Sequence, residues 1–409
     1  MKKVLVLLLA AAMIFTFAAC APSSSTPSAT TGDVPAKTTE PTEPSESSKD
    51  KEIELSADGR YPKETVKMGF VNYDTTAEQV LAVQEYFKYL QTGLNFEVIW
   101  SESLNNAEEE FAFIEQCAAA GCKGIIGYYN EGNEESAKLC GNLNMYYWGL
   151  GGKPEAYELV KNEPYYIGCN ASADNYQFGY SIAEMLVAND AGKIIVMSGG
   201  KDYGVPFFVD RYKGIMDGIA AAKADGKDIE VVYEVPGWPG TEEFAAHQTA
   251  ALATDADGLA GTLTSLMWIQ PMQVAGKFGQ IKVATVDTVS NVVVDMMGAG
   301  MYVGVVAEIP EAFGMAVPMI INAVTGYGDQ QRNSDGSAAQ IEAGYWEINS
   351  VEEAGYLLSI SNAEGGYAFS IDDVKTVLGA YNPDFTVEDM NALYTAVSVE
   401  EIQARKAAD

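Results

Sequence analysis

The sequence predicts an α/β protein with two lobes, each built on a doubly wound sheet of parallel strands. Short apolar runs alternate with amphipathic stretches from Val66 to Val324, and this alternation is typical of parallel strands joined by crossover helices. The strand-like runs are almost continuously apolar, as expected for strands that helices cover on both faces. The alternating body is also too long for one ordinary sheet domain, so we expect two lobes.

In the first half of this body, strand-like runs alternate with helical stretches. The clearest helix covers residues 77–90, where Val80, Val83 and Phe87 belong to an apolar face with a spacing of roughly 3.6 residues. The next helix ends where Gly121 follows it. We expect strands at 66–71, 96–100, 124–128, 145–148 and 165–168, and helices at 77–90, 107–120 and 134–140.

The alternation repeats in the second half. We expect strands at 193–198, 229–235, 258–263, 282–286 and 302–307, and helices at 175–187, 208–224, 242–253, 272–277, 292–299 and 311–324. After these elements we expect a return strand at 340–348 and two helices, at 369–380 and 387–396, that pack on the surface of one lobe. Right-handed crossovers bring the loops after parallel strands to one edge of each sheet, where open α/β sheets bind ligands. Two lobes that face each other through these edges would form a cleft.

The N-terminus predicts export. Two lysines precede an uncharged apolar run at 4–17, which is too short for a comfortable membrane span and is typical of a signal peptide at 1–19. Two alanines lead directly into Cys20, and this pattern resembles the lipobox of bacterial lipoproteins, with Phe17 in place of the usual leucine. The resemblance implies lipidation of Cys20. The alternative is an ordinary secretory signal that happens to contain a cysteine.

The segment after Cys20 predicts a flexible tether. Residues 21–51 are rich in Ser, Thr and Pro and contain almost no large apolar side chain, so they cannot bury enough surface to offset the entropy of ordering. We assign residues 20–60 to a disordered linker, which a lipid-anchored receptor would need to clear the membrane. A generic disordered terminus would have the same composition.

Charge and hydropathy restrict the partners. The formal net charge of the chain is −32, which argues against nucleic acid and against direct adsorption to anionic lipid. After the signal, no apolar stretch approaches the length of a transmembrane helix. We therefore expect a protein on the outer face of the cell membrane that contacts the bilayer only through its lipid anchor.

The cysteines and the histidine favour neither a metal site nor an enzyme. Cys117, Cys122, Cys140 and Cys169 lie in one half of the chain, and we interpret them as small buried apolar side chains. A disulfide from Cys117 or Cys122 to Cys140 is the alternative. With His247 as the single histidine, histidine-based metal sites and Ser-His-Asp hydrolysis have little support. Since no acid–base pair has a recognisable setting either, we predict no cofactor, no metal and no catalysis.

Several stretches of the body share their order and spacing with a known family. They are residues 68–74, 166–170 with 175–179, 210–215, and 284–288 with 305–310. Together, over about residues 66–327, they resemble the type I periplasmic sugar-binding proteins of ABC importers, such as ribose- and galactose-binding proteins. The resemblance implies two lobes joined by a multi-strand hinge, with a cleft that binds a sugar-like ligand.

The sequence departs from this family where the family binds sugar hydroxyls. Residues 72–76 read Asn-Tyr-Asp-Thr-Thr in place of Asn-Pro-Phe-Phe, residues 147–149 lack an Asp-Arg pair, and residues 263–264 replace an Asn-Asp pair. These changes leave the ligand open, as a sugar, a nucleoside, a modified sugar or another ring compound. The tail at 355–409 has no clear counterpart in the family.

The resemblance places the candidate site on loops of both lobes. Arg211 is the strongest candidate, since a guanidinium offers five donors in a rigid fork, and Asp287 could accept two hydroxyls. An ion pair of Arg211 with Asp287 between the lobes, without ligand contact, is the alternative. Further polar candidates are Asn72, Asp74, Asn130, Thr264 and Glu308, and Tyr73, Tyr129, Trp148, Phe207 and Trp268 could stack on a ring or serve only packing.

These interpretations together predict a monomeric solute-binding protein. The N-terminal lobe comprises 65–170 and 309–333, and the C-terminal lobe comprises 171–308 and 340–409 with extra helices. Hinge crossings near Asn170, Glu308 and residues 332–340 would let a small-molecule ligand close the lobes, and the closed form would dock on ABC permease subunits. A receptor that feeds a sensor kinase or chemoreceptor is an alternative use of the same fold. A repressor with similar lobes would need an N-terminal helix-turn-helix, which the signal and linker replace.

Overall fold

The computed structural model describes residues 52–128, 133–150, 154–171, 174–203 and 205–408. The predicted signal peptide, Cys20 and most of the predicted linker lie outside the described residues, as do Tyr129 and Asn130. Within the described part of the chain, no helix combines the length and the apolar character needed to cross a membrane.

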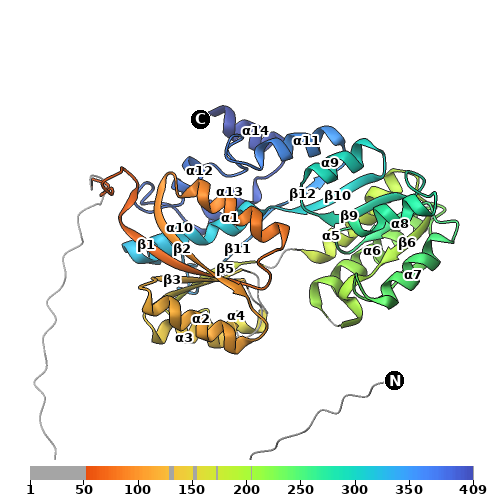
Figure 1. The fold of residues 1–409 in the computed structure, drawn as a ribbon. Coiled ribbons are helices and arrows are strands. Elements are labelled where there is room, and N and C mark those ends of the chain that lie inside the picture. The colour runs from red at the N-terminus through yellow and green to blue at the C-terminus, as the bar shows by residue number, and fades with distance from the viewer. Residues whose placement is uncertain (1–51, 129–132, 151–153, 172–173, 204, 409) are drawn as a thin grey trace, which may run out of the picture. The chain divides into compact units, whose positions relative to one another are not determined.

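The first sheet holds six strands among the described residues, and all its ladders are parallel (Figure 1). In spatial order the strands are β11 (Ala339–Ile341), β5 (Tyr166–Asn170), β4 (Tyr146–Gly149), β3 (Gly124–Gly127), β1 (Tyr61–Asn72) and β2 (Leu94–Ser103). Its apolar faces are covered by α2 (Ala107–Ala119), α3 (Asn133–Asn142) and α4 (Pro154–Val160) on one side and by α1 (Glu78–Leu90) and α10 (Ala316–Thr325) on the other.

The second sheet repeats this plan. Its strands are β12 (Tyr345–Ile348), β10 (Tyr302–Glu308), β9 (Lys282–Asp287), β8 (Gly258–Gly261), β6 (Lys193–Met197) and β7 (Glu230–Val235), and only the β10–β12 ladder among them is antiparallel. The covering helices are α5 (Asn175–Ala188) and α6 (Pro206–Ala224) on one face, and α7 (Glu242–Leu252), α8 (Ile269–Val274) and α9 (Asn291–Gly298) on the other. The predicted pair of doubly wound α/β lobes is confirmed.

The predicted return strand at 340–348 is wrong as a single element. The chain leaves the first sheet at Ile341 and enters the second at Tyr345, so β11 and β12 belong to different sheets. Between them the backbone N–H of Gly344 donates to the carbonyl of Tyr394 at 2.8 Å. The third hinge crossing therefore lies at residues 342–344 and not at 332–340. Arg332 is instead held to the first lobe, where its guanidinium donates to the carbonyls of residues 163, 164 and 166.

The segment around Pro310 also differs from the prediction. The expected helix at 311–324 starts as a 3-10 turn, η3 (Pro310–Met315), and becomes the α-helix α10 only at Ala316. Gly314 lies so close to the ring of Tyr86 that an added Cβ would come within 2.3 Å of it. This close approach packs the second crossing tightly against α1. Further 3-10 turns are η1 (Gly199–Tyr203), η2 (Leu266–Trp268) and η4 (Gly328–Gln331).

The C-terminal tail packs on both lobes, although we expected it on the C-terminal lobe. It forms α11 (Val351–Ile360), α12 (Ile371–Lys375), α13 (Val387–Thr395) and α14 (Val399–Ala408), so the helix expected at 369–380 is shorter and two further helices appear. Helix α11 packs beside α9 in the second lobe. In the first lobe, the Tyr86 hydroxyl donates to the carbonyl of Phe369 at 3.0 Å, and the Asn322 amide donates to the carbonyl of Val377 at 2.9 Å.

The cysteines are packing residues, as predicted. Cys117, Cys122, Cys140 and Cys169 are all buried, and each is a free thiol. All of them belong to the apolar layer between the first sheet and helices α2 and α3. His247 is half-buried rather than on the surface, and its Nδ1 lies 3.0 Å from the Tyr233 hydroxyl.

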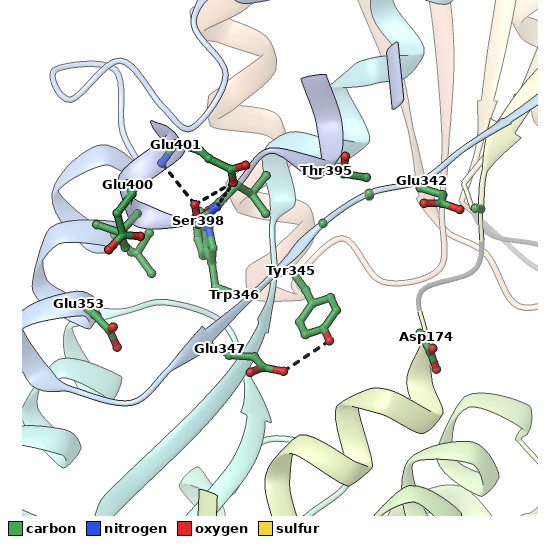
Figure 2. A pocket seen from close by; sticks show the side chains of 16 residues that line it. Asp174, Glu342, Tyr345, Trp346, Glu347, Glu353, Thr395, Ser398, Glu400 and Glu401 are labelled. Carbon is green, nitrogen blue, oxygen red and sulfur yellow. Dashed lines mark hydrogen bonds between the residues drawn. The ribbon is translucent and has the colours of Figure 1, made fainter. Parts of the chain in front are cut away.

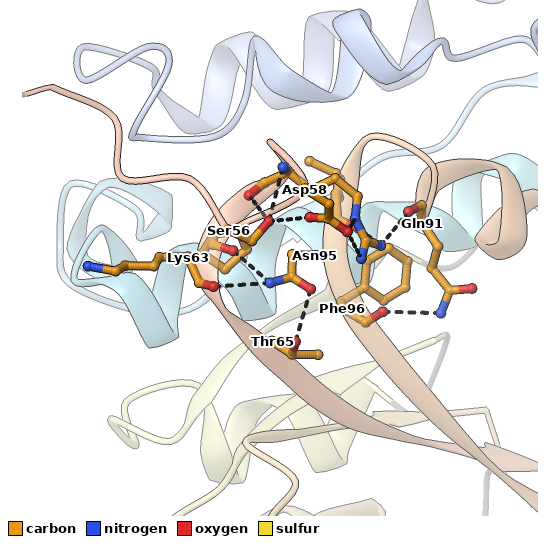
Figure 3. Close-up of polar contacts among 10 residues, drawn as sticks. Ser56, Asp58, Lys63, Thr65, Gln91, Asn95 and Phe96 are labelled. Carbon is orange, nitrogen blue, oxygen red and sulfur yellow. Dashed lines mark hydrogen bonds and ion pairs between the residues drawn. The ribbon is translucent and has the colours of Figure 1, made fainter.

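Asn95 holds the start of β1 against β2 (Figure 3). The register between these strands shifts between Tyr61 and Val66, which leaves backbone carbonyls of β1 without ladder partners. The buried Asn95 amide donates to the carbonyls of Pro62 and Lys63 at 2.9 and 3.2 Å, and its oxygen accepts from the Thr65 hydroxyl at 3.0 Å. One side chain thus supplies the hydrogen bonds that the irregular ladder lacks.

We predict that Asn95→Ala lowers the free energy of unfolding by about 1–3 kcal/mol, because it leaves buried carbonyl groups unpaired. Urea denaturation followed by circular dichroism measures the change. Asn105→Ala is the matched control, since the Asn105 side chain bonds only the exposed Glu109 carboxylate, and we expect it to cost less than about 0.5 kcal/mol. Equal stability of the Asn95 variant and the wild type would contradict the assigned role.

Candidate ligand-binding site

The candidate site lies where the parallel strands of both sheets end. Tyr128 directly follows β3 of the first sheet. Asp287 is the last residue of β9 and Glu308 the last of β10 in the second sheet. Strands β9 and β10 are neighbours, and Asp287 pairs in register with Ala307, the residue before Glu308. Both carboxylates therefore lie at this edge, but they leave it on opposite faces of the sheet. This is the edge at which open parallel sheets bind ligands.

An ion pair between a buried Arg211 and a half-buried Glu308 forms the centre of the second lobe's half of the site. Arg211 projects from α6 with 7% of its surface exposed, and its Nη2 lies 3.3 Å from Oε1 of Glu308. Its Nε donates to Oδ1 of Asn175 at 2.7 Å, and its Nη1 donates to the carbonyl of Thr262 at 3.1 Å. Burial lowers the pKa of the guanidinium, and the Glu308 carboxylate opposes that shift. The side chain is therefore fixed within its own lobe.

A hydrogen-bond chain joins this ion pair to the first lobe. The Gln79 amide, from the first turn of α1, donates to Oε2 of Glu308 at 3.0 Å. The Tyr128 hydroxyl donates to Oε1 of Gln79 at 2.6 Å. The ring of Tyr73 lies edge-on against Tyr128, with their centroids 5.2 Å apart. Arg211 and Tyr128 are thus connected through Glu308 and Gln79.

Asp287 is held in place by donors from its own lobe. Its Oδ2 accepts from the Thr264 hydroxyl at 2.9 Å and from the Tyr302 hydroxyl at 3.4 Å. Its Oδ1 accepts from the backbone N–H of Thr288 at 2.9 Å. Burial raises the pKa of Asp287 to about 6, and the negative charge of Glu78 on α1 adds to the rise. Asp287 and Thr264, which were predicted separately as site residues, are therefore hydrogen-bonded to each other. The partner of Arg211 is Glu308 and not Asp287.

Three predicted ligand residues are fully buried in this structure, and for the two tryptophans this favours the packing alternative. The Asn72 amide donates to the carbonyl of Ser101 beneath the β1 edge. The Trp148 indole N–H donates to Oδ1 of Asn170 at 2.8 Å, beside the first hinge crossing. The Trp268 indole N–H points at the sulfur of Met197, 3.1 Å away. None of these side chains presents surface to a ligand.

The remaining predicted residues lie at the rim. Tyr73 is 42% exposed and Phe207 38% exposed, so each offers ring surface to solvent. The Phe207 ring also lies 5.2 Å from the Arg211 guanidinium. Asp74 caps its own turn, because its Oδ1 accepts from the backbone N–H and the hydroxyl of Thr76, and these bonds lower its pKa. Asp74 therefore shapes the loop rather than presenting a free carboxylate.

Sequence reasoning missed Gln79, Tyr128 and Asn175. A polar residue in the first turn of a helix is normally expected to face solvent. Gln79 could have been singled out only because its helix starts just after β1, at the sheet edge where the site was expected. Tyr128 was assigned to the end of a strand, and the loops after parallel strands are where the ligand site was expected, so its position could have singled it out.

A separate acidic cavity of about 700 Å³ lies beside the third crossing (Figure 2). Its carboxylates are largely used within the fold. Glu347 accepts from the hydroxyls of Ser181 and Tyr345, and Glu401 accepts from the backbone N–H and hydroxyl of Ser398 at the start of α14. We assign these groups to hinge and helix-end stabilisation.

Comparison with known proteins identifies the fold. No family model and no curated protein sequence matches the chain. Among solved structures, a periplasmic sugar-binding protein from Pseudomonas fluorescens matches with a TM-score of 0.62 and 12% identity, over 83% of this chain and 99% of that one. An ABC transporter periplasmic solute-binding protein from Actinobacillus succinogenes with bound D-allose matches with a TM-score of 0.57 and 15% identity, over 71% and 99%. An ABC transporter solute-binding protein from Bacillus halodurans with bound myo-inositol matches with a TM-score of 0.55 and 15% identity, over 72% of this chain and 97% of that one. The chain therefore has the two-lobed fold of periplasmic sugar-binding proteins of ABC transporters, as the sequence motifs predicted.

We predict that Asp287→Asn stabilises the ligand-free protein at pH 7. A carboxyl with a raised pKa contributes its full stability below the ordinary value of 3.8 and loses it as the pH rises towards about 6. Replacing it with Asn should raise the free energy of unfolding at pH 7 by up to about 2 kcal/mol, and the gain should vanish near pH 4. Urea denaturation at both pH values measures this. Asp74→Asn, at a carboxyl with a lowered pKa, should show no such gain, and a destabilised Asp287→Asn protein at pH 7 would contradict the prediction.

We predict that Gln79→Ala shifts the ligand-free protein towards a more open state. It removes a hydrogen bond to a carboxylate, and such bonds contribute about 1.5–3 kcal/mol, so the open population should rise roughly tenfold or more. Fluorophores on Leu159→Cys in the first lobe and Val274→Cys in the second, in a protein with Cys20→Ser, would report the distance, because both sites are exposed and the four cysteines of the described residues are buried.

The matched control for this experiment is Gln177→Ala, whose side chain bonds Ser181 within one lobe. It should leave the measured distance unchanged. An unchanged distance in the Gln79 variant would show that the cross-lobe bond does not hold the lobes together.

Proposed function

We propose that this chain is an exported solute-binding protein that captures a small, polar, ring-containing ligand between its lobes and delivers it to an ABC importer. The observation that carries the proposal is the hydrogen bond from Gln79, in the first turn of α1, to Glu308, which ends β10 next to the strand that Asp287 ends at the carboxyl edge of the second sheet. The similar folds that hold D-allose and myo-inositol support a sugar-like ligand.

In this proposal the second lobe supplies most of the polar contacts. Asp287 accepts hydrogen bonds from ligand hydroxyls, and its own donors fix its orientation beforehand. Glu308 accepts further donors once the ligand displaces Gln79, while Arg211 positions Glu308 by their ion pair. Tyr73 and Phe207 cover the apolar face of the ring, since aromatic planes pack on the C–H faces of sugars.

Closure follows from contacts that a ligand makes with both lobes. A ligand that touches Asp287 and Tyr73 together binds the closed state better than the open state, and this difference shifts the population. The crossings at Asn170, Glu308 and residues 342–344 would bend. The closed monomer then docks on the permease, while lipid on Cys20 and the linker keep the protein at the outer face of the cell membrane. We assign the lobes as 65–170 with 309–333, and 171–308 with the later residues shared between them.

Two alternatives keep the fold and change its use. A receptor that presents the ligand to a sensor kinase or chemoreceptor would need the same cleft, and a nucleoside binder would use the same aromatic rim. An enzymatic function agrees less well with these observations. The structural neighbours named above are binding proteins, and the Asp287 carboxylate already accepts hydrogen bonds from its own lobe.

We predict saturable binding when the protein is titrated with pentoses, hexoses, inositols, nucleosides and amino acids, followed by calorimetry and by the melting temperature. Asp287→Ala should lower the affinity for the ligand at least tenfold, because the protein loses a carboxylate that accepts hydrogen bonds from two ligand hydroxyls. Phe207→Ala should weaken it about fivefold, as expected for the loss of one aromatic contact.

Val274→Ala is the control, since Val274 is 84% exposed on α8 and lies outside the site. It should not change the affinity. A panel of this breadth without any binding would count against the proposed function, and binding that survives both site variants would place the ligand elsewhere.

A further inference from the structure

The chain after β12 adds a connection between the lobes to the three crossings described above (Figure 1). We call residues 351–408 the C-terminal strap. It begins as α11, which packs beside α9 of the second lobe and buries Leu357. An exposed turn at residues 362–364 then leads to the first lobe, where the Tyr86 hydroxyl donates to the carbonyl of Phe369 at 3.0 Å. One continuous stretch of chain is therefore anchored in both lobes.

The anchor of the strap on the first lobe is buried. Asn322 on α10 bonds the strap twice, because its amide donates to the carbonyl of Val377 at 2.9 Å and its oxygen accepts from the backbone N–H of Gly379 at 2.9 Å. Gly379 also lies so close to the ring of Tyr327 that an added Cβ would come within 2.3 Å of it. Detaching the strap would leave the buried Asn322 without these partners, which is costly.

The strap also holds the third crossing, at residues 342–344 (Figure 2). Oδ1 of Asn391 on α13 accepts from the backbone N–H of Glu342 at 2.8 Å. The carbonyl of Tyr394 accepts from the backbone N–H of Gly344 at 2.8 Å. A hinge segment must change its backbone dihedral angles when lobes rotate. Such a change would turn these N–H groups away from their acceptors on the strap.

A third contact lies on β12, directly after the crossing. The Trp346 indole N–H donates to the carbonyl of Val397 at 2.9 Å, and both residues are buried. Gly344 packs on the same valine, since an added Cβ would come within 2.3 Å of a methyl carbon of Val397. The strap is therefore packed against the crossing as well as hydrogen-bonded to it.

The end of the strap closes on its middle. On α14, the Arg405 guanidinium donates to the carbonyl of Ala368 at 2.9 Å, and the Lys406 ammonium donates to the carbonyl of Gly365 at 2.9 Å. These bonds join α14 to the segment that enters the first lobe. The strap is thus one folded unit, and it has little slack to give when the lobes move apart.

We propose that the C-terminal strap is a brace that limits how far the ligand-free lobes open. The inference goes beyond the proposed function, because it concerns the range of lobe motion and not the solute. A ligand binds more weakly when the binding-competent state is a smaller fraction of the population. Wider opening lowers that fraction, so the brace raises the affinity without touching the ligand.

The test slackens the strap and keeps the rest of the chain. A flexible insertion of about six Gly and Ser residues between Ala363 and Glu364 lengthens the exposed turn between the lobes and removes none of the contacts above. Trp346→Phe removes the indole N–H that bonds Val397. The fluorophore pair at positions 159 and 274 in the Cys20→Ser protein measures the distance between the lobes without ligand.

We expect the insertion to lengthen the mean distance between the fluorophores. Trp346→Phe should raise the open population about two- to tenfold, as for the loss of one hydrogen bond. The two changes combined should open the lobes further than either alone. Urea denaturation of each variant shows that the protein measured is folded.

Two variants serve as controls. The same insertion between Gly226 and Lys227 lengthens an exposed turn between α6 and β7, within the second lobe. Asn382→Ala removes a bond to the carbonyl of Thr376 that stays inside the strap. Both should leave the distance unchanged.

The outcome separates the brace from the proposed function. An unchanged distance in the folded protein with the insertion at residues 363–364 would overturn the brace, and so would an equal change in the control insertion. Because the measurement needs no ligand, failure of every solute to bind would count against the proposed function alone.

Discussion

The ion pair between Arg211 and Glu308 sets the geometry of the proposed site. A buried guanidinium is costly unless hydrogen bonds and a counter-charge meet it, and removing one partner of such a pair leaves the other uncompensated. Asn175, Thr262 and Glu308 together meet this demand, and all three belong to the second lobe. Glu308 is also the last residue of β10, so the ion pair fixes the point at which the chain leaves the second sheet. The second carboxylate oxygen of Glu308 accepts a hydrogen bond from Gln79, and this bond connects the ion pair to the first lobe.

The position of the hinge follows from the direction in which the chain runs through the two parallel sheets. Parallel strands need crossovers, and the carboxyl ends of all the strands in a sheet meet at one edge. The chain passes between the sheets after β5, after β10 and between β11 and β12. At each crossing the backbone is held by side chains or carbonyls of the body: Trp148 bonds Asn170, Tyr86 packs on Gly314, and Tyr394 accepts from Gly344. The tail beyond β12 contacts both lobes, so it can limit how far they separate.

The fold could be predicted from the sequence because its strands are continuous apolar runs between amphipathic helices, and this pattern is local. The break at residues 342–344 could not, since Ile341 and Tyr345 flank it in one extended stretch and only the tertiary structure sends them to different sheets. Thr264 and Asp287 were each expected at the site from the family resemblance, and the structure adds the hydrogen bond between them. The role of Trp148 stayed open between stacking and packing, because a residue near a strand end can point into the lobe or out of it. In the structure the indole packs in the interior beside Gly168, where an added Cβ would lie 2.6 Å from it.

The polar half of the proposed site is complete before any ligand arrives. The donors to Asp287 and the partners of Arg211, apart from the cross-lobe bond to Glu308, all come from the second lobe. Such preorganisation lowers the entropy that a ligand must lose on binding. It has a cost, because burial holds the pKa of Asp287 near 6 and an ionised Asp287 destabilises the empty protein at neutral pH. A lobe shaped only for stability would not keep a partly desolvated carboxylate at an open sheet edge. A carboxylate whose pKa is raised by burial at such an edge is typical of a functional site.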